Sequence, residues 1–324
     1  MEVTREQFLA QRNRTFGHQN PTRMNVPFWE FMVRNGQCAY WATAHFGAAD
    51  EVRPGPVWCF DRFGMSQTAL PDGRTICIAG EHEDHYDPDF CIYNDVIVRH
   101  DDGRIEIFGY PADVFPPTDF HSATLINGDQ ILLIGSLGYP ADRRPDQTQL
   151  LLLDLNDYRM STLETSGELP GWISRHEAQF DNDRTITIRG GKTIRMQDGE
   201  QILRDNVEEF ALDLTTRSWK RNTDRRWKQF AIRPESLARA RSLLMAGVNS
   251  FRPAGLPHSA TPGAEWNELL LCVDGVMITL SLRVSFVHVL IQGNLPDRPL
   301  TRLLQEIQTR VEQVSQSTCV TTSL

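Results

Sequence analysis

The cysteines of this sequence are few and dispersed. Six of them are spread over 324 residues, with no CxxC pair and no dense cluster. In so long a chain this spacing argues against a disulfide scaffold or a zinc knuckle, so we interpret them as reduced thiols that fill the core. Standard catalytic motifs are missing too: there is no GxSxG, Walker loop, dinucleotide-binding fingerprint or catalytic-cysteine signature. No common catalytic class is therefore indicated, and we predict no catalytic residue.

Long apolar runs are also missing. The most apolar stretch, residues 269–291, is interrupted by Asp274, Arg283 and His288, and its apolar residues alternate. This pattern predicts strands and not a membrane span. The first residues, MEVTREQFLAQRNR, are charged from the second position and lack the apolar core of a signal peptide. We therefore expect a cytoplasmic protein without a membrane partner.

Positive charge is in deficit. Lysine and arginine total 33 against 42 aspartates and glutamates, which gives a formal net charge of −9. Such a chain repels polyphosphate, so nucleic acid is not an expected partner. Residues 217–241 are locally basic and include Trp219 and Trp227. Because they match no nucleic-acid motif, we interpret them as a solvated face or as a counterpart to an acidic loop.

The N-terminal residues 1–57 predict a helical cap. Thr4 and Gln7 have the spacing of a capping box, which indicates a short helix around Phe8. Pro27 suits a first helical position, and Gly36 divides the aromatic stretch 27–46 into two helical pieces. The aromatic residues indicate either a docking surface or, as we prefer, a cap buried against the main domain.

Residues 58–223 contain three repeats of about 55 residues. Segments 66–81, 121–136 and 176–191 align, and each predicts two strands joined by a turn. Their closing glycines, Gly80, Gly135 and Gly190, stand 55 residues apart. A second pair of strands follows in each repeat, at 94–108, 150–163 and 207–222. Four short antiparallel strands per repeat are what a propeller blade requires.

The third repeat resembles a kelch repeat. It combines His176, the double glycine Gly190-Gly191 and the segment ALDLTTRSW, which ends at Trp219. The first two repeats resemble the same pattern but keep one glycine of the pair and lack the tryptophan. This resemblance implies a mainly β fold, a kelch-like β-propeller of about four or five blades, with N- and C-terminal helices packed on it. It also implies protein interaction as the commonest role. Since His121, His176 and His258 open their units, we expect them to form structural hydrogen bonds and not to take part in catalysis.

Residues 224–324 are expected to complete the same domain. His258 opens an HSAT tetrapeptide like that of His121, so strands from 258 to 286 are a candidate fourth blade, which leaves ring closure open. Residues 234–247 begin with Pro234 and end with Gly247, residue types that commonly start and end a helix, so we predict a helix there. Residues 299–314 predict an amphipathic helix with its apolar stripe in the core. The stripe consists of Leu300, Leu303, Leu304, Ile307, Val311 and Val314.

The loop GEHEDHYDPDF, residues 80–90, crowds carboxylates and imidazoles. Its ligand types suit a divalent metal, but its spacing matches neither an EF-hand nor HExxH, so the cofactor stays unknown. The alternatives are carboxylates that cap turns, histidines bonded within the loop, or an acidic surface that faces a basic partner. The loop residues considered are Glu81, His82, Glu83, Asp84, His85, Tyr86 and Asp87.

A pentapeptide, GYPAD, occurs twice, at residues 109–113 and 138–142. Loops that follow even-numbered strands of a blade emerge on the same rim, so both pentapeptides and the acidic loop are expected on one face. Exposed aromatic and arginine side chains on proline-rich loops would make a binding surface, although the tyrosines alternatively pack beneath their loops. Beyond the acidic loop, the predicted contact residues are Tyr110, Tyr139, Arg143, Arg144 and Trp172.

Three functions are compatible with these features. The first is a protein–protein interaction module that presents the acidic, aromatic loop face. The second is an enzyme acting on a sugar or small polar ligand at the propeller mouth, or a metal-assisted hydrolase using Glu81, His82 and His85. The third is a stoichiometric inhibitor or toxin-neutralising protein, because an acidic surface suits a basic target.

Overall fold

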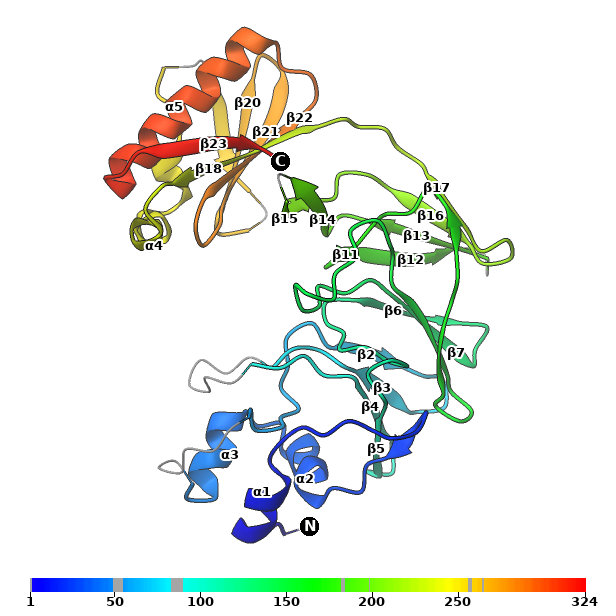
Figure 1. Cartoon of the computed structure of the whole chain (residues 1–324). Helices are drawn as coiled ribbons and strands as arrows, with labels where there is room; N and C mark the ends of the chain where they lie inside the picture. The colour runs from blue at the N-terminus through cyan, green and yellow to red at the C-terminus, as the bar shows by residue number, and fades with distance from the viewer. Residues whose placement is uncertain are drawn as a thin grey trace. The chain divides into compact units, whose positions relative to one another are not determined.

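The computed structural model describes residues 2–48, 55–82, 90–181, 184–197, 199–255, 258–263 and 265–324. The chain divides into two compact units, Met1–Thr223 and Asp224–Leu324. Both are built mainly from antiparallel sheets, and no sheet formed by the described residues closes on itself. Figure 1 shows the order of the elements along the chain.

Three helices begin the first unit: α1 (Arg5–Gln11), α2 (Pro27–Asn35) and α3 (Ala39–His45). The predicted capping box of Thr4 and Gln7 is present, and Gly36 ends α2 in the left-handed conformation. Phe8, Phe28 and Trp29 pack in one core cluster with Ile97 and Ile107 of the first sheet. The predicted helical cap is confirmed, and it covers one face of that sheet.

The described residues of the first unit form three main sheets, and the three predicted hairpins are confirmed. Each sheet contains four strands of one repeat in sequence order, and the first and third sheets gain one more strand at the outer edge. The first sheet holds β1 (Thr22–Arg23), β2 (Ser66–Ala69), β3 (Thr75–Ile78), β4 (Asp95–Arg99) and β5 (Ile105–Gly109); the second holds β6 (Ser122–Ile126), β7 (Gln130–Ile134), β8 (Leu150–Asp154) and β9 (Met160–Thr162); the third holds β10 (Ser166–Gly167), β12 (Glu177–Asp181), β13 (Thr185–Arg189), β16 (Phe210–Asp213) and β17 (Ser218–Arg221).

The third repeat carries an insertion that the sequence pattern did not reveal. Between its second and third strands the chain forms a hairpin of β14 (Lys192–Gln197) and β15 (Glu200–Asp205). The short strand β11 (Ile173–Ser174) pairs with β14. The inserted hairpin begins directly after the double glycine of the repeat.

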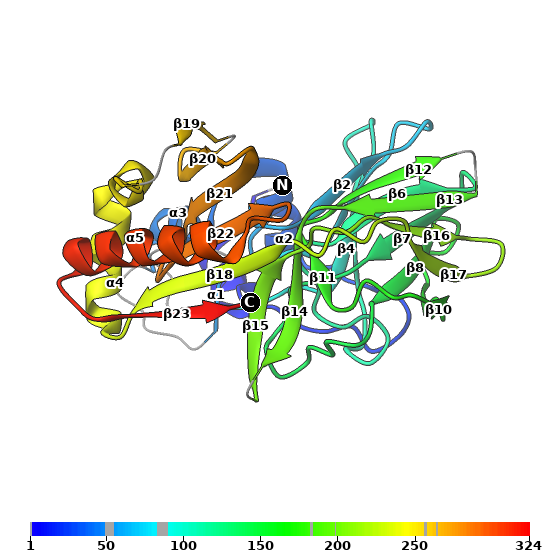
Figure 2. The ribbon, with the colours of Figure 1, turned by 90° about the horizontal axis from the view of Figure 1, so that it is seen from above.

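The three main sheets of the first unit stack face to face (Figures 1 and 2). Ile131 and Leu133 pack toward the first sheet, and the alternate residues Leu132 and Ile134 pack toward the third. Both faces of the second sheet are therefore buried, which explains the continuous apolar run of β7. The other face of the third sheet is polar: Glu177, Gln179, Arg189 and Lys220 are exposed there.

A ladder of hydrogen bonds joins equivalent positions of successive repeats. The Phe120 amide donates to the Gly64 carbonyl at 2.9 Å, and the Arg175 amide donates to the Phe120 carbonyl at 2.8 Å. Gly64, Phe120 and Arg175 all have positive φ angles. The chain therefore enters each first strand through the same left-handed turn.

The histidines that open the repeats add a side-chain bond to this ladder. His121 Nε2 lies 2.8 Å from Ser66 Oγ, and His176 Nε2 lies 2.9 Å from Ser122 Oγ. The predicted structural role is thus confirmed for both. His258 differs, because it lies in the second unit and accepts a hydrogen bond from Arg252 Nε at 2.8 Å.

The second unit contains one sheet whose strand order, within the described residues, is β19-β20-β21-β22-β18-β23. The strands of the candidate fourth blade, β19 to β22, lie in one sheet with β18 and β23, which come from the two ends of the unit. The prediction of a separate four-stranded blade is therefore corrected. The strands are β18 (Lys228–Pro234), β19 (Ser259–Pro262), β20 (Glu268–Val273), β21 (Val276–Leu282), β22 (Val287–Gln292) and β23 (Cys319–Ser323).

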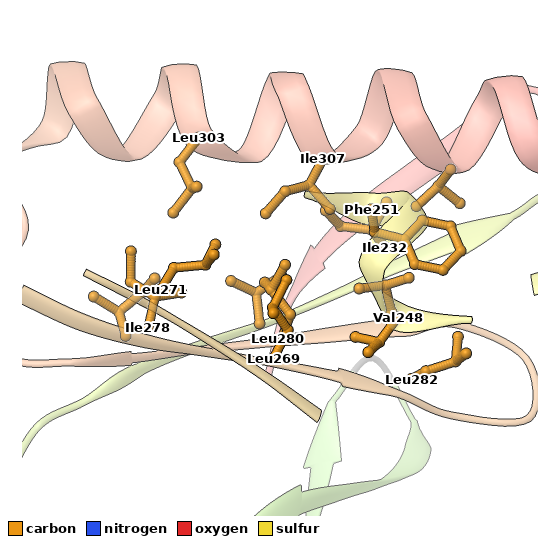
Figure 3. Packing of buried hydrophobic residues seen from close by; sticks show 14 of the residues in the cluster. Ile232, Val248, Phe251, Leu269, Leu271, Ile278, Leu280, Leu282, Leu303 and Ile307 are labelled. Carbon is orange, nitrogen blue, oxygen red and sulfur yellow. The ribbon is translucent and has the colours of Figure 1, made fainter. Parts of the chain in front are cut away.

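Two helices, α4 (Leu237–Ala246) and α5 (Asp297–Ser315), and the short 3₁₀ helix η1 (Val248–Phe251) complete the second unit. In Figure 3, Leu303 and Ile307 of α5 point toward Leu271 and Leu280 of the sheet. The predicted apolar stripe is confirmed, with its residues buried or packed against the same core.

Candidate functional site

Loops from neighbouring repeats of the first unit meet at one end of the sheets and enclose a pocket of about 380 Å³. Residues 110–117 follow β5, residues 135–149 join β7 to β8, and residues 163–172 follow β9. Pro116, Arg144, Leu169 and Trp172 all line the pocket. The structure therefore brings together the loops of the two GYPAD pentapeptides, whereas most of the acidic loop lies outside the described residues.

The floor of the pocket is apolar and its rim is polar. Leu150, Leu151 and Leu163 belong to the hydrophobic clusters between the sheets and also line the pocket. The rim carries carboxylates, hydroxyls and amides on exposed or half-buried residues. An apolar floor with a few polar groups around it is the usual composition of a ligand pocket. The polar rim residues are Asp113, Asp142, Arg144, Gln147, Thr148, Gln149, Thr162, Glu164 and Thr165.

Asp119 fixes the loop that holds the second GYPAD pentapeptide. Its side chain is fully buried, and Oδ1 accepts hydrogen bonds from the Gly138 amide at 2.7 Å and from Ser136 Oγ at 3.0 Å. Trp172 Nε1 donates to the Leu137 carbonyl at 3.0 Å. Asp119 precedes the second repeat and Trp172 follows it, so side chains from both sides of the repeat hold the loop in place by hydrogen bonds.

Arg143 stabilises the same loop by hydrogen bonds to the loop's own backbone. Its Nε donates to the Leu137 carbonyl at 2.9 Å, and its Nη2 donates to the Gly138 carbonyl at 3.1 Å. Burial lowers the pKa of Arg143, and the charge of Asp119 opposes that shift. The predicted contact residue Arg143 therefore directs most of its donors at the backbone of its own loop.

The two GYPAD tyrosines do not form an exposed contact surface. Tyr110 is fully buried and donates its hydroxyl to the Tyr158 carbonyl at 2.7 Å, so its prediction as a contact residue is corrected. Tyr139 is half-buried: its hydroxyl accepts from the Ile92 amide at 2.8 Å, and its ring makes a T-shaped contact with the ring of Phe90. Both follow the alternative in which the tyrosine packs beneath a loop.

Trp172 and Arg144 lie at the pocket in different ways. Trp172 is 8% exposed, so it forms part of the wall and is not a protruding anchor. Arg144 is exposed, and its Nη1 donates to the carbonyls of Ala141 and Arg143. Of the predicted contact residues beyond the acidic loop, these are the two that line the pocket.

Most of the acidic loop lies outside the described residues, namely Glu83, Asp84, His85, Tyr86 and Asp87. Glu81 is half-buried and its backbone pairs with Phe63. His82 is 2% exposed and lies with Nδ1 3.1 Å from Cys59 Sγ, so its prediction as a surface contact is corrected.

The Cys59–His82 pair does not have the character of an activated nucleophile. Cys59 is buried, and desolvation raises the pKa of its thiol to about 12 although the charge of Arg62 opposes the shift. The thiolate that nucleophilic catalysis needs is therefore disfavoured at neutral pH. Within the described ranges, no group of three or more histidine, cysteine, aspartate or glutamate residues is arranged to hold a metal ion.

Sequence reasoning missed the pocket residues Gln147 and Glu164 and the supporting role of Asp119. Asp119 ends the segment PPTD, residues 116–119, which is a proline-rich connection between the first two repeats, so its position carried a signal. Gln147 and Glu164 are ordinary polar loop residues, and only the folded arrangement distinguishes them.

Comparison with known proteins does not assign the chain: no protein-family model and no curated protein sequence matches it. In the part of the chain that the structure describes, no helix has the length and apolar character needed to cross a membrane. The pocket is consequently interpreted from its own residues.

Proposed function

We propose that residues 58–223 form an incomplete kelch-like β-propeller that works as a protein-binding module, with the pocket at residues 113–172 as its contact site. The kelch-like assignment is supported by four strands per repeat, by the face-to-face stacking and by the Gly64–Phe120–Arg175 ladder. It also agrees with the closing glycine Gly135, because a Cβ there would lie 2.2 Å from the carbonyl oxygen of Ile173, which lies just before the third repeat.

The observation that carries the binding role is the convergence of loops from successive repeats on one pocket. Thr148 Oγ1 donates to the Gly171 carbonyl at 3.0 Å, and Gln149 Nε2 donates to Thr118 Oγ1 at 2.9 Å. Such bonds between loops fix the pocket before a partner arrives, which reduces the entropic cost of binding. A rigid pocket with an apolar floor also suits insertion of a partner side chain as an anchor.

Site-specific photo-crosslinking tests this function. A photoreactive amino acid replaces Gln147 or Asp113, which are exposed at the pocket, or Lys220, which is exposed on the polar face of the third sheet. In an extract of the source cells, we expect both pocket positions to crosslink the same protein and Lys220 to crosslink none. A partner captured equally from Lys220, or none captured from either pocket position, would contradict the proposal.

A further inference from the structure

The charge around the pocket is unbalanced. Asp113, Asp142 and Glu164 contribute three carboxylates to the lining, and among the described lining residues Arg144 is the single basic one. Arg144 turns its Nη1 toward two backbone carbonyls of its own loop, at 3.0 Å and 2.9 Å. The rim therefore presents an excess of negative charge to whatever enters.

These carboxylates differ from others in the first unit. Asp72, Asp102 and Asp213 each form an ion pair with a nearby arginine. In the described part of the chain, no ion pair engages the carboxylates of Asp113, Asp142 or Glu164. Their charge is available to a ligand, and it lies above a floor of leucine side chains and the Trp172 ring.

An apolar floor beneath an anionic rim is complementary to one kind of protein side chain. Lysine and arginine have a long aliphatic stem that packs on apolar surface and a cationic end that stays near carboxylates. An aspartate or glutamate would meet like charge, and a purely aliphatic side chain would leave the rim without a partner. A pocket of about 380 Å³ has room for one such side chain with its flanking backbone.

We infer that the pocket binds a lysine or arginine side chain presented by the partner protein, held by Asp142 and Glu164 at the rim and by the leucine floor. The inference rests on the proposed function, because it names the chemistry of the partner at the same pocket. It adds a specificity that the convergence of the loops alone does not require.

The test uses the full chain and small blocked amino acids as probes. N-acetyl-lysine methylamide, its arginine counterpart, the neutral norleucine counterpart and the anionic glutamate counterpart are titrated while the indole N–H resonance of Trp172 is followed. We expect a saturable shift with the lysine or arginine probe that weakens as salt is added. Asp142→Asn with Glu164→Gln should weaken that binding by up to about fivefold per carboxylate. Asp146→Asn is the matched control, since Asp146 is an exposed acid of the same loop outside the pocket lining, and it should leave the affinity unchanged.

The inference is overturned if norleucine binds as tightly as lysine and arginine, if glutamate binds more tightly, or if no probe shifts the resonance. It is also overturned if Asp146→Asn weakens binding as much as the double variant does. These results are separable from failure of the proposed function. If Gln147 and Asp113 crosslink a partner but the probes show no preference for a cation, the inference alone is rejected. If neither position crosslinks a partner, the binding module is rejected.

Discussion

Asp119 is the residue on which the geometry of the pocket loop most depends. Replacing it with alanine removes the acceptor for the Gly138 amide and the Ser136 hydroxyl. Both of these hydrogen bonds are buried. Hydrogen bonds to a charged group contribute about 1.5 to 3 kcal/mol, so we expect Asp119→Ala to lower the free energy of unfolding by about that amount. Urea denaturation measures the loss. Asp129→Ala is the control because Asp129 is exposed; an equal loss in both variants would argue against the role of Asp119.

The buried histidines of the ladder predict a dependence of stability on pH. Burial lowers the pKa of His121 from 6.5 to about 3 and that of His176 from 6.5 to about 4. Below pH 6.5 the unfolded chain therefore binds protons that the folded chain does not. Stability should fall as pH drops below that value, by about 1.4 kcal/mol per pH unit for each histidine.

Urea denaturation at a series of pH values from neutral to mildly acidic checks this slope. His176→Gln should reduce the slope by the share of one histidine, whatever it does to stability at neutral pH. A slope that is unaffected by His176→Gln would show that this histidine titrates normally in the folded state.

At the scale of the element, the closing glycine Gly135 allows the second repeat to pack closely against the chain that leads into the third. Gly135 has a φ of 76°, and a Cβ there would meet the Ile173 carbonyl oxygen at 2.2 Å. Gly128 has a nearly equal φ of 79° with nothing within 4 Å of a Cβ. Both alanine variants carry the strain of a left-handed residue, about 1 to 2 kcal/mol. Gly135→Ala should cost about 1 to 3 kcal/mol more, because it also forces the sheets apart. Thermal denaturation of the pair measures the difference, and equal losses would contradict the close approach.

Helices and strands could be predicted where the sequence pattern that specifies them lies within the same short segment. The hairpins at 66–81, 121–136 and 176–191 follow from alternation and turn residues, and the cap of α1 follows from Thr4 and Gln7. The hairpin β14–β15 was missed, because an insertion interrupts the repeat and its strands have no counterpart in the other two. The strands after His258 were placed in a fourth repeat on a shared tetrapeptide. They do pair with one another in sequence order, but β22 also pairs with β18, and β18 pairs with β23, so the sheet is wider than a four-stranded blade.

The division into two units makes a prediction for the whole molecule. Ile307 of α5 is fully buried in the core of the second unit, so Ile307→Ala should cost about 2 to 5 kcal/mol. Native-state hydrogen exchange should show faster exchange in residues 224–324 and unchanged exchange in the three stacked sheets. Thr301→Ala, on the exposed side of the same helix, should change neither. Equal acceleration in both units would show that they unfold together.

The site was predictable only in outline. Strand order placed the loops at one end of the repeats, and Arg144 and Trp172 do line the pocket. The burial of Tyr110 was left as an open alternative and that of His82 was not foreseen, because a motif in a loop does not show whether its side chain points outward or into the core. The pocket itself depends on convergence of residues from Asp113 to Trp172, which no local pattern encodes.

The most direct test of the central claim is a hydrogen-exchange footprint on the full chain. The ligand is a peptide selected from a random library for binding to the full chain. Exchange should slow at residues 113–117, 142–151 and 162–172, which line the pocket, and should stay unchanged elsewhere. Protection confined to the polar face of the third sheet or to residues 224–324 would contradict the account.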